Sequence, residues 1–191
     1  MHEQLADIVK GFETARARLQ RLTANILPEK FTVRNDIGRW SAGECIGHLN
    51  ITSRAYVTLL NNAFAQHAKP ARSPTHYRRD AAGWFIGKLA GPMPRIGSFR
   101  FGRTPTVPAF IPDRSAGREA LLADFETSQN EQIALVKTAE GHALENIQIA
   151  SPFNARLKYN AFSCLVLLPQ HQHRHLEQAE NVWPQAAERD G

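Results

Sequence analysis

The stretch Trp40–Leu49, WSAGECIGHL, contains the clearest helix start in the chain. Ser41 followed three residues later by Glu44 forms a capping box, in which the serine oxygen accepts from the Glu44 amide and the Glu44 carboxylate accepts from the Ser41 amide. The tryptophan before the cap and Cys45 hold the two positions that pack together as a hydrophobic staple. Because apolar residues continue at helical spacing, we predict a helix that runs to about His67.

Other parts of the chain show the same helical spacing of apolar residues. Helices are predicted at residues 5–26, at about 115–139, and after Ser151–Pro152. Pro169 lies inside the last one, and we expect a kink or a restart there, because proline removes an amide donor and clashes with the preceding turn. Four helices without a convincing alternating strand predict an all-α four-helix bundle. The long link between the second and third helices allows those two to run parallel.

Composition limits the class of protein. The chain has 191 residues, of which 42% are apolar and 21% charged, so we expect one globular domain over residues 1–191. The longest stretch without Lys, Arg, Asp or Glu, residues 159–173, is too short for a membrane span. The first twenty residues lack the apolar run of a secretory signal, so we expect a cytoplasmic protein. Cys45 and Cys164 lie in apolar surroundings, and we expect two reduced, buried thiols.

A proline- and arginine-rich connection occupies residues 68–114. From Lys69 to Arg114 it holds nine Lys and Arg residues against Asp80 and Asp113, a net charge of +7 in a chain whose total is +5. It also holds seven of the eleven prolines, which disfavours long regular structure. A short helix is predicted around Asp80–Leu89, with Trp84 and Phe85 among the residues that could cover a core edge. The basic charge makes this segment a candidate surface for nucleic acid or an acidic partner, although it has no recognition motif.

The histidines carry the clearest chemical signal. His171 and His175 are four residues apart, so on a helix they share one face and can bind a common ion. His173 lies about 200° from His171 and cannot join them. His48 is predicted on an inner face of its own helix. Taken alone, it is more readily interpreted as a hydrogen-bonded core histidine. The pair of His171 and His175, taken alone, is more readily interpreted as part of a solvated helix face. One site explains all three better, because facing helices of a bundle build metal sites, and three imidazoles leave coordination positions open.

Two motifs resemble those of the DinB/YfiT-like superfamily. The run from Trp40 to Leu49 is similar to its W-S-x-x-E-x-x-x-H-L signature, and His171–Gln178 to its closing H-x-x-x-H-x-x-Q motif. The resemblance implies an up-down-down-up four-helix bundle, often dimeric, with a divalent ion bound by His48, His171 and His175. It also implies a metal-dependent hydrolase or a transferase that uses a low-molecular-weight thiol as cofactor. The ion would be zinc, nickel, iron or manganese.

Other residues are weaker candidates for the same site. Gln178 could bond a ligand imidazole or a bound water, and Glu44 could orient His48 if the capping box did not already occupy it. Arg174 and a loop group could meet an anionic substrate at the bundle mouth, although a solvated surface is the favoured interpretation of these residues. That loop group is His76, Arg78 and Arg79.

Three functions remain open at this point. We expect first an enzyme acting on a small-molecule substrate, with no membrane partner and with a homodimer as the expected assembly. The second is a metal-binding scaffold or sensor without turnover, which requires the same three histidines. The third is a binding module that uses the basic segment 69–114.

Overall fold

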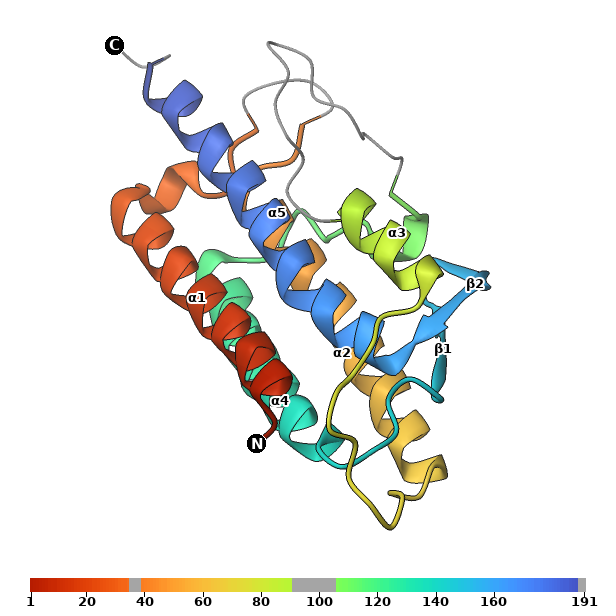
Figure 1. Cartoon of the computed structure of the whole chain (residues 1–191). Coiled ribbons are helices and arrows are strands. Elements are labelled where there is room, and N and C mark those ends of the chain that lie inside the picture. The colour runs from red at the N-terminus through yellow and green to blue at the C-terminus, as the bar shows by residue number, and fades with distance from the viewer. Residues whose placement is uncertain (35–38, 91–105, 189–191) are drawn as a thin grey trace.

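A computed structural model describes residues 1–34, 39–90 and 106–188, and these are mostly helical (Figure 1). The elements in chain order are α1 (Glu3–Asn25), η1 (Pro28–Lys30), α2 (Ala42–Gln66), α3 (Ala81–Ala90), η2 (Pro108–Phe110), α4 (Arg118–Ala139), β1 (Gln148–Ser151), β2 (Asn154–Asn160) and α5 (Ala161–Glu188). The predicted helical character is confirmed, but the all-α prediction is wrong because a small antiparallel sheet is present. Within the described ranges, none of the helices combines the length and apolarity needed to cross a membrane.

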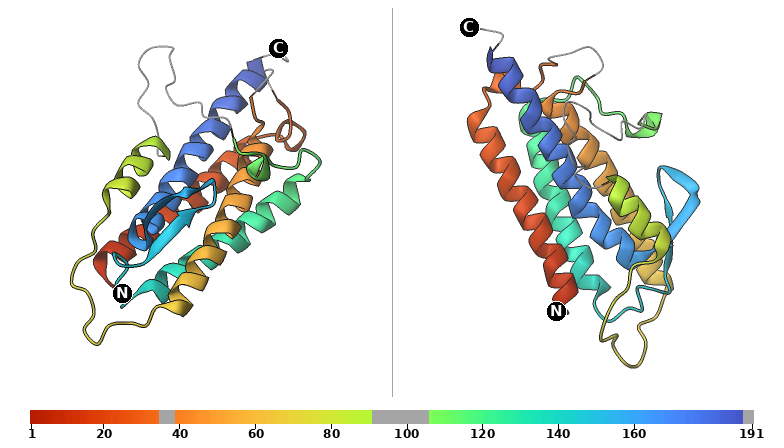
Figure 2. Two further views of the ribbon diagram at one scale, coloured as in Figure 1. Left: turned by 90° about the vertical axis from the view of Figure 1, so that its right-hand side faces the viewer. Right: turned by 45° about the horizontal axis from the view of Figure 1, so that its top comes forward.

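The four long helices, α1, α2, α4 and α5, pack side by side around the core. The most extensive contacts between them follow the cyclic order α1, α4, α2, α5. Gly11 lies against Pro169, and Arg18 of α1 forms an ion pair with Glu180 of α5, so α1 and α5 run parallel. Figure 1 shows α2 and α4 running in the opposite direction. Helix α3 and the two strands lie together beside α2 and α5 (Figure 2).

The helix start predicted after Ser151–Pro152 is wrong, because residues 148–160 form a β-hairpin. Strands β1 and β2 pair antiparallel, with Ile149 opposite Tyr159 and an irregularity after Ala150. Ile149 and Tyr159 are both buried, so one face of the hairpin is held against the core. Helix α5 therefore begins only at Ala161, nine residues after the proline that suggested its start.

Helix α5 continues through Pro169 without a break, so the predicted restart is not seen. The proline ring lies against Gly11 of α1, and a Cβ atom at that glycine would come within 3.0 Å of the Pro169 Cβ. The absence of a side chain at Gly11 thus gives the proline room at the α1–α5 contact.

The predicted ends of the other helices are close to the observed ones. The capping box at Ser41 and Glu44 is present in full at the start of α2. Helix α4 starts at Arg118, after a cap at Gly117, three residues later than predicted. The chain turns after α4 at Gly141, whose φ of 85° is a backbone conformation that favours glycine.

The short helix predicted in the connection is confirmed as α3. Asp80 caps it by accepting from the Gly83 amide, and the Ser163 hydroxyl of α5 donates to the same carboxylate. Trp84 and Phe85, however, are more than half exposed and do not cover the core edge. Gly83 instead faces α5, which allows the two helices to approach closely.

The apolar core consists of two clusters of buried side chains. Along α4 and α5 they are separated by a buried polar pair, in which Gln129 Nε2 donates to Gln172 Oε1 at 2.8 Å. This hydrogen bond satisfies polar groups that burial alone would leave unpaired. The polar layer lies at the level of the histidine cluster, because Gln172 directly follows His171 in α5.

Candidate metal centre

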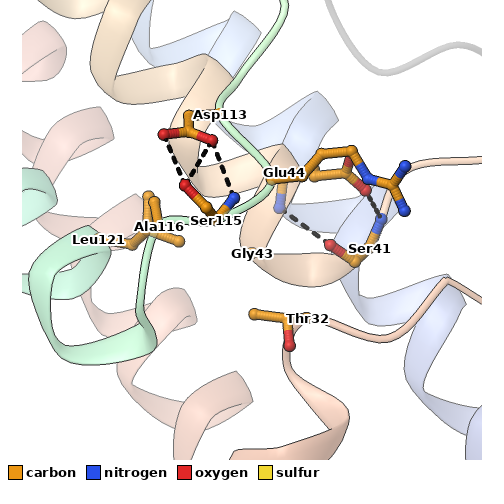
Figure 3. Close-up of a pocket in the computed structure, with 9 residues that line it drawn as sticks. Thr32, Ser41, Gly43, Glu44, Asp113, Ser115, Ala116 and Leu121 are labelled. Atoms are coloured by element: carbon orange, nitrogen blue, oxygen red, sulfur yellow. Dashed lines mark hydrogen bonds and ion pairs between the residues drawn. The ribbon is translucent and has the colours of Figure 1, made fainter.

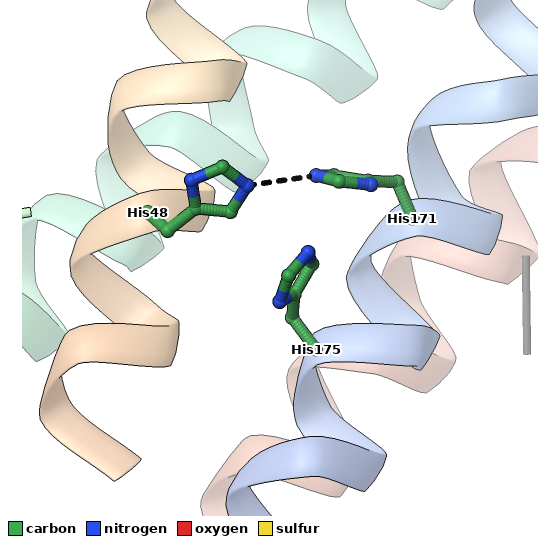
Figure 4. Close-up of side chains that lie close together, drawn as sticks. All are labelled: His48, His171 and His175. Carbon is green, nitrogen blue, oxygen red and sulfur yellow. Dashed lines mark hydrogen bonds between the residues drawn. The ribbon is translucent and has the colours of Figure 1, made fainter. Parts of the chain in front are cut away.

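Three imidazoles from two helices meet at one point of the α2–α5 contact (Figure 4). His48 comes from α2, and His171 and His175 come from successive turns of α5. One nitrogen of each ring lies within 4.8 Å of the other two, and His171 Nε2 is 3.3 Å from His48 Nε2. His173 points toward α1 instead, near the Gly11 backbone, as its helical position predicts. The structure therefore brings together the three histidines that the sequence singled out.

The orientation of His48 is set by the chain connection. His48 Nδ1 donates to the backbone carbonyl of Phe110 in η2 at 2.8 Å, which leaves the lone pair on Nε2, the atom facing His171. The connection passes close to α2 here, since a Cβ atom at Gly47 would lie 2.9 Å from the Pro112 Cβ. Sequence reasoning missed this partner, because a backbone acceptor 62 residues away carries no residue-type signal.

Burial keeps the three imidazoles neutral. It is the largest cause lowering the pKa of His48, and it lowers the pKa of His171 to about 3. The pKa of His175 also falls well below its ordinary value through burial, and then through its two neighbours in the cluster and Arg174. A neutral imidazole has a free lone pair and is the form that binds metal ions.

Aromatic rings flank the cluster. The Trp40 ring lies 5.0 Å from the His48 ring and 6.0 Å from the His175 ring, measured between centroids. Phe153, in the turn between β1 and β2, lies 6.3 Å from both His48 and His171. Trp40 therefore packs over the histidines, a contact that its predicted staple position at the helix start does not specify.

The weaker site candidates have more varied surroundings. The Glu44 carboxylate bonds the Ser41 amide and forms an ion pair with Arg34, while the Nδ1 partner of His48 is a backbone carbonyl. Gln178 forms a side-chain hydrogen bond with His175. This bond raises the pKa of His175, but the opposite effect of burial is larger. The Nδ1 atom of His175 itself has no hydrogen-bond partner.

The basic candidates are divided between the site and the scaffold. Arg174 is half-buried and close enough to lower the pKa of His171 and His175. Arg79 bonds the Gly83 carbonyl of α3, and His76 is exposed. The Arg78 carbonyl accepts from the Asn160 side chain. Three of the basic residues counted in the connection lie outside the described residues: Arg95, Arg100 and Arg103.

Neither cysteine can act as a nucleophile at the surface. Cys45 and Cys164 are free thiols with no exposed area, as predicted. Burial raises the pKa of both, so both remain protonated thiols at neutral pH.

A pocket of about 370 Å³ lies beside the N-terminal cap of α2 (Figure 3). Glu44 and Ser41 line it together with residues 113–116 of the connection, and none of the three clustered histidines does. Arg114, 3.8 Å from Glu44, adds a second cation beside that carboxylate. The acidic and basic groups of this pocket already compensate one another.

The donor set of the histidine cluster fits a transition metal ion. Two nitrogens bound tetrahedrally to zinc at about 2.0–2.1 Å lie about 3.4 Å apart. His171 Nε2 and His48 Nε2, 3.3 Å apart, match that spacing, and the third nitrogen lies within 4.8 Å of the other two. Within the described residues, no other His, Cys, Asp or Glu side chains form such a group of three. An all-imidazole set suits zinc, nickel, iron and copper.

Comparison with known proteins agrees with the motifs. No curated protein matches the chain. No solved structure matches it either. The sequence profile of the DinB superfamily matches residues 11–179, a range that includes all three clustered histidines and both motifs. The chain therefore belongs to the DinB superfamily.

Proposed function

We propose that this protein is a metal-dependent enzyme, a hydrolase or a transferase that uses a low-molecular-weight thiol, acting on a small-molecule substrate. The observation that supports this most is the cluster of three neutral imidazoles from α2 and α5. Three protein ligands are the number that catalytic metal sites use, because further positions must stay open for water or substrate. A structural site would be closed by a fourth protein ligand.

A divalent ion in this site would lower the pKa of a bound water or thiol and so supply a nucleophile at neutral pH. The protein's own part is to hold the three ligands. His48 is oriented by the Phe110 carbonyl, and His171 and His175 are fixed one turn apart on α5. Because both cysteines are buried, we infer that a thiol nucleophile comes from an external cofactor.

We also propose that the four long helices form the up-down-down-up bundle of the superfamily. The contacts of α1 with α5 support parallel first and last helices. In the other pair, Asn50 of α2 bonds the Leu121 carbonyl of α4, and Arg54 pairs with Asp124 one turn on. Helices α2 and α4 therefore run parallel, which supports a crossover connection between them.

Metal analysis of the purified protein tests the proposed function. The protein is prepared without a metal-affinity tag, beside a His171→Ala/His175→Ala double variant and a His173→Ala control from the opposite face of α5. We expect about one transition metal ion per chain in the wild type and the control, and none in the double variant. Equal metal content in all three proteins would contradict the proposed site.

Turnover is then measured on the metal-loaded wild type with activated esters in water, and with aryl electrophiles plus a low-molecular-weight thiol. The two enzyme classes differ in the second condition, since only a transferase consumes the thiol with the electrophile. We expect activity that chelation removes and metal restores. A metal-loaded protein inactive in both assays would favour a scaffold or sensor.

A further inference from the structure

Phe153 is placed over the histidine cluster by a part of the chain that carries neither motif. It follows β1 in the hairpin turn, where its amide donates to the Ser151 hydroxyl. Its ring lies 6.3 Å from His48, 6.3 Å from His171 and 4.2 Å from the ring of Phe110. Phe110 is buried, whereas Phe153 keeps part of its surface exposed. The hairpin therefore presents a half-covered aromatic ring beside the proposed ligands.

Trp40 borders the same cluster from the start of α2. Its ring contacts His48 and His175, while Phe153 contacts His48 and His171, so each ring touches a different α5 ligand. Trp40 is also only partly buried. A molecule that entered the coordination sphere would meet these two rings, and covering their exposed surface with an apolar group would be favourable.

We propose that Phe153, assisted by Trp40, selects substrates that carry a flat apolar group, such as an aryl ring, next to the atom that reacts at the metal. This inference rests on the proposed function and names its substrate class. Aromatic rings attract one another at centroid distances of about 4.5–7 Å in offset or edge-to-face geometry. Since Phe153 lies 6.3 Å from two of the proposed ligand rings, an aryl group carried next to a metal-bound atom would lie beside the Phe153 ring.

A purely structural role for Phe153 makes a different prediction. Its contact with Phe110 could serve only to fasten the hairpin to the connection. In that case, truncating the side chain would change stability but would not distinguish between aryl and methyl ligands. The test must therefore compare two ligands with the same metal-binding group.

The experiment uses the full chain loaded with Co²⁺, whose visible absorption reports on coordination without requiring turnover. Acetohydroxamate and benzohydroxamate are titrated into the wild type, Phe153→Ala and Phe153→Leu, with Phe85→Ala, an exposed phenylalanine of α3, as control. We expect the wild type and the control to bind benzohydroxamate about tenfold more tightly, a ratio equivalent to about 1.4 kcal/mol. Phe153→Ala should abolish this preference and leave the acetohydroxamate Kd unchanged.

Phe153→Leu keeps an apolar side chain against Phe110, so it decides the question if the alanine variant does not fold. We expect the leucine variant to lose at least half of the preference on a logarithmic scale. A preference unchanged in both variants, or absent from the wild type, would overturn the inference while leaving the metal centre intact. No cobalt coordination band in the wild type would overturn the proposed metal centre, and this inference with it.

Discussion

Removing His171 should change how the stability of the metal-free protein depends on pH. Burial lowers the pKa of His171 in the folded protein to about 3, from an ordinary value near 6.5. Below pH 6.5 the unfolded chain therefore binds a proton that the folded protein excludes. The free energy of unfolding falls as the pH decreases toward 3, since stability rises with pH wherever the unfolded state binds more protons.

The size of this effect follows from the two pKa values. Between about pH 7 and about pH 5, one histidine with these values lowers the free energy of unfolding by about 2 kcal/mol. His171→Asn removes that contribution, while burial still lowers the pKa of His48 and of His175. The wild type should therefore lose about 2 kcal/mol more than the variant over this range.

Urea denaturation at the two pH values, with a chelator present throughout, measures the difference. His76→Asn makes the same substitution at an exposed position and should behave as the wild type does. Equal losses in the wild type and His171→Asn would refute the conclusion that the imidazole is kept neutral by burial in the folded protein.

Three further substitutions test the packing around the site. Gly83→Ala would place a Cβ atom 2.1 Å from the Ser163 Cβ. This clash should lower the free energy of unfolding, measured by urea denaturation, by about 1–3 kcal/mol. Adding Ser163→Gly to the same chain should recover part of that loss. Ser41→Ala removes the cap of α2 and should lower the free energy of unfolding by about 1 kcal/mol, measured in the same way. Gly47→Ala should displace the connection that supplies the Phe110 carbonyl and weaken metal affinity about tenfold or more in a chelator competition; unchanged affinity would contradict a role for that carbonyl.

The start of α2 could be predicted because its signals are local. Ser41 and Glu44 satisfy each other's backbone amides within a single turn, so no distant contact is needed to specify the cap. The pairing of His171 with His175 is equally local, since helical geometry alone places them on one face. The prediction that His48 joins them depended on the assumption that α2 and the last helix face each other.

The hairpin before α5 has only a partial signal in the sequence. Ile149 and Tyr159 pair across two short strands. The residues of β2, Asn154–Asn160, alternate between polar and apolar types, whereas the four residues of β1 do not. Ser151–Pro152 resembles a helix start, whereas here Ser151 ends β1 and Pro152 lies in the turn. Tertiary packing against the core decided the local structure.

The surroundings of the site depend on similar long-range contacts. Phe110 reaches His48 from a proline-rich connection, and Phe153 reaches it from the hairpin turn. Neither approach follows a sequence periodicity, because both depend on how irregular segments pass over the bundle. The sequence therefore identified the three histidines but not the aromatic rings or the carbonyl group around them.

Anomalous diffraction from crystals of the protein tests the metal centre most directly. Data collected above and below the absorption edge of the metal found by elemental analysis locate that ion in the electron density. The proposed function predicts a single strong peak bonded to His48, His171 and His175, at about 2.0–2.1 Å from each nitrogen for zinc. A peak coordinated by other residues, or no peak in crystals soaked with the metal, would contradict the proposal.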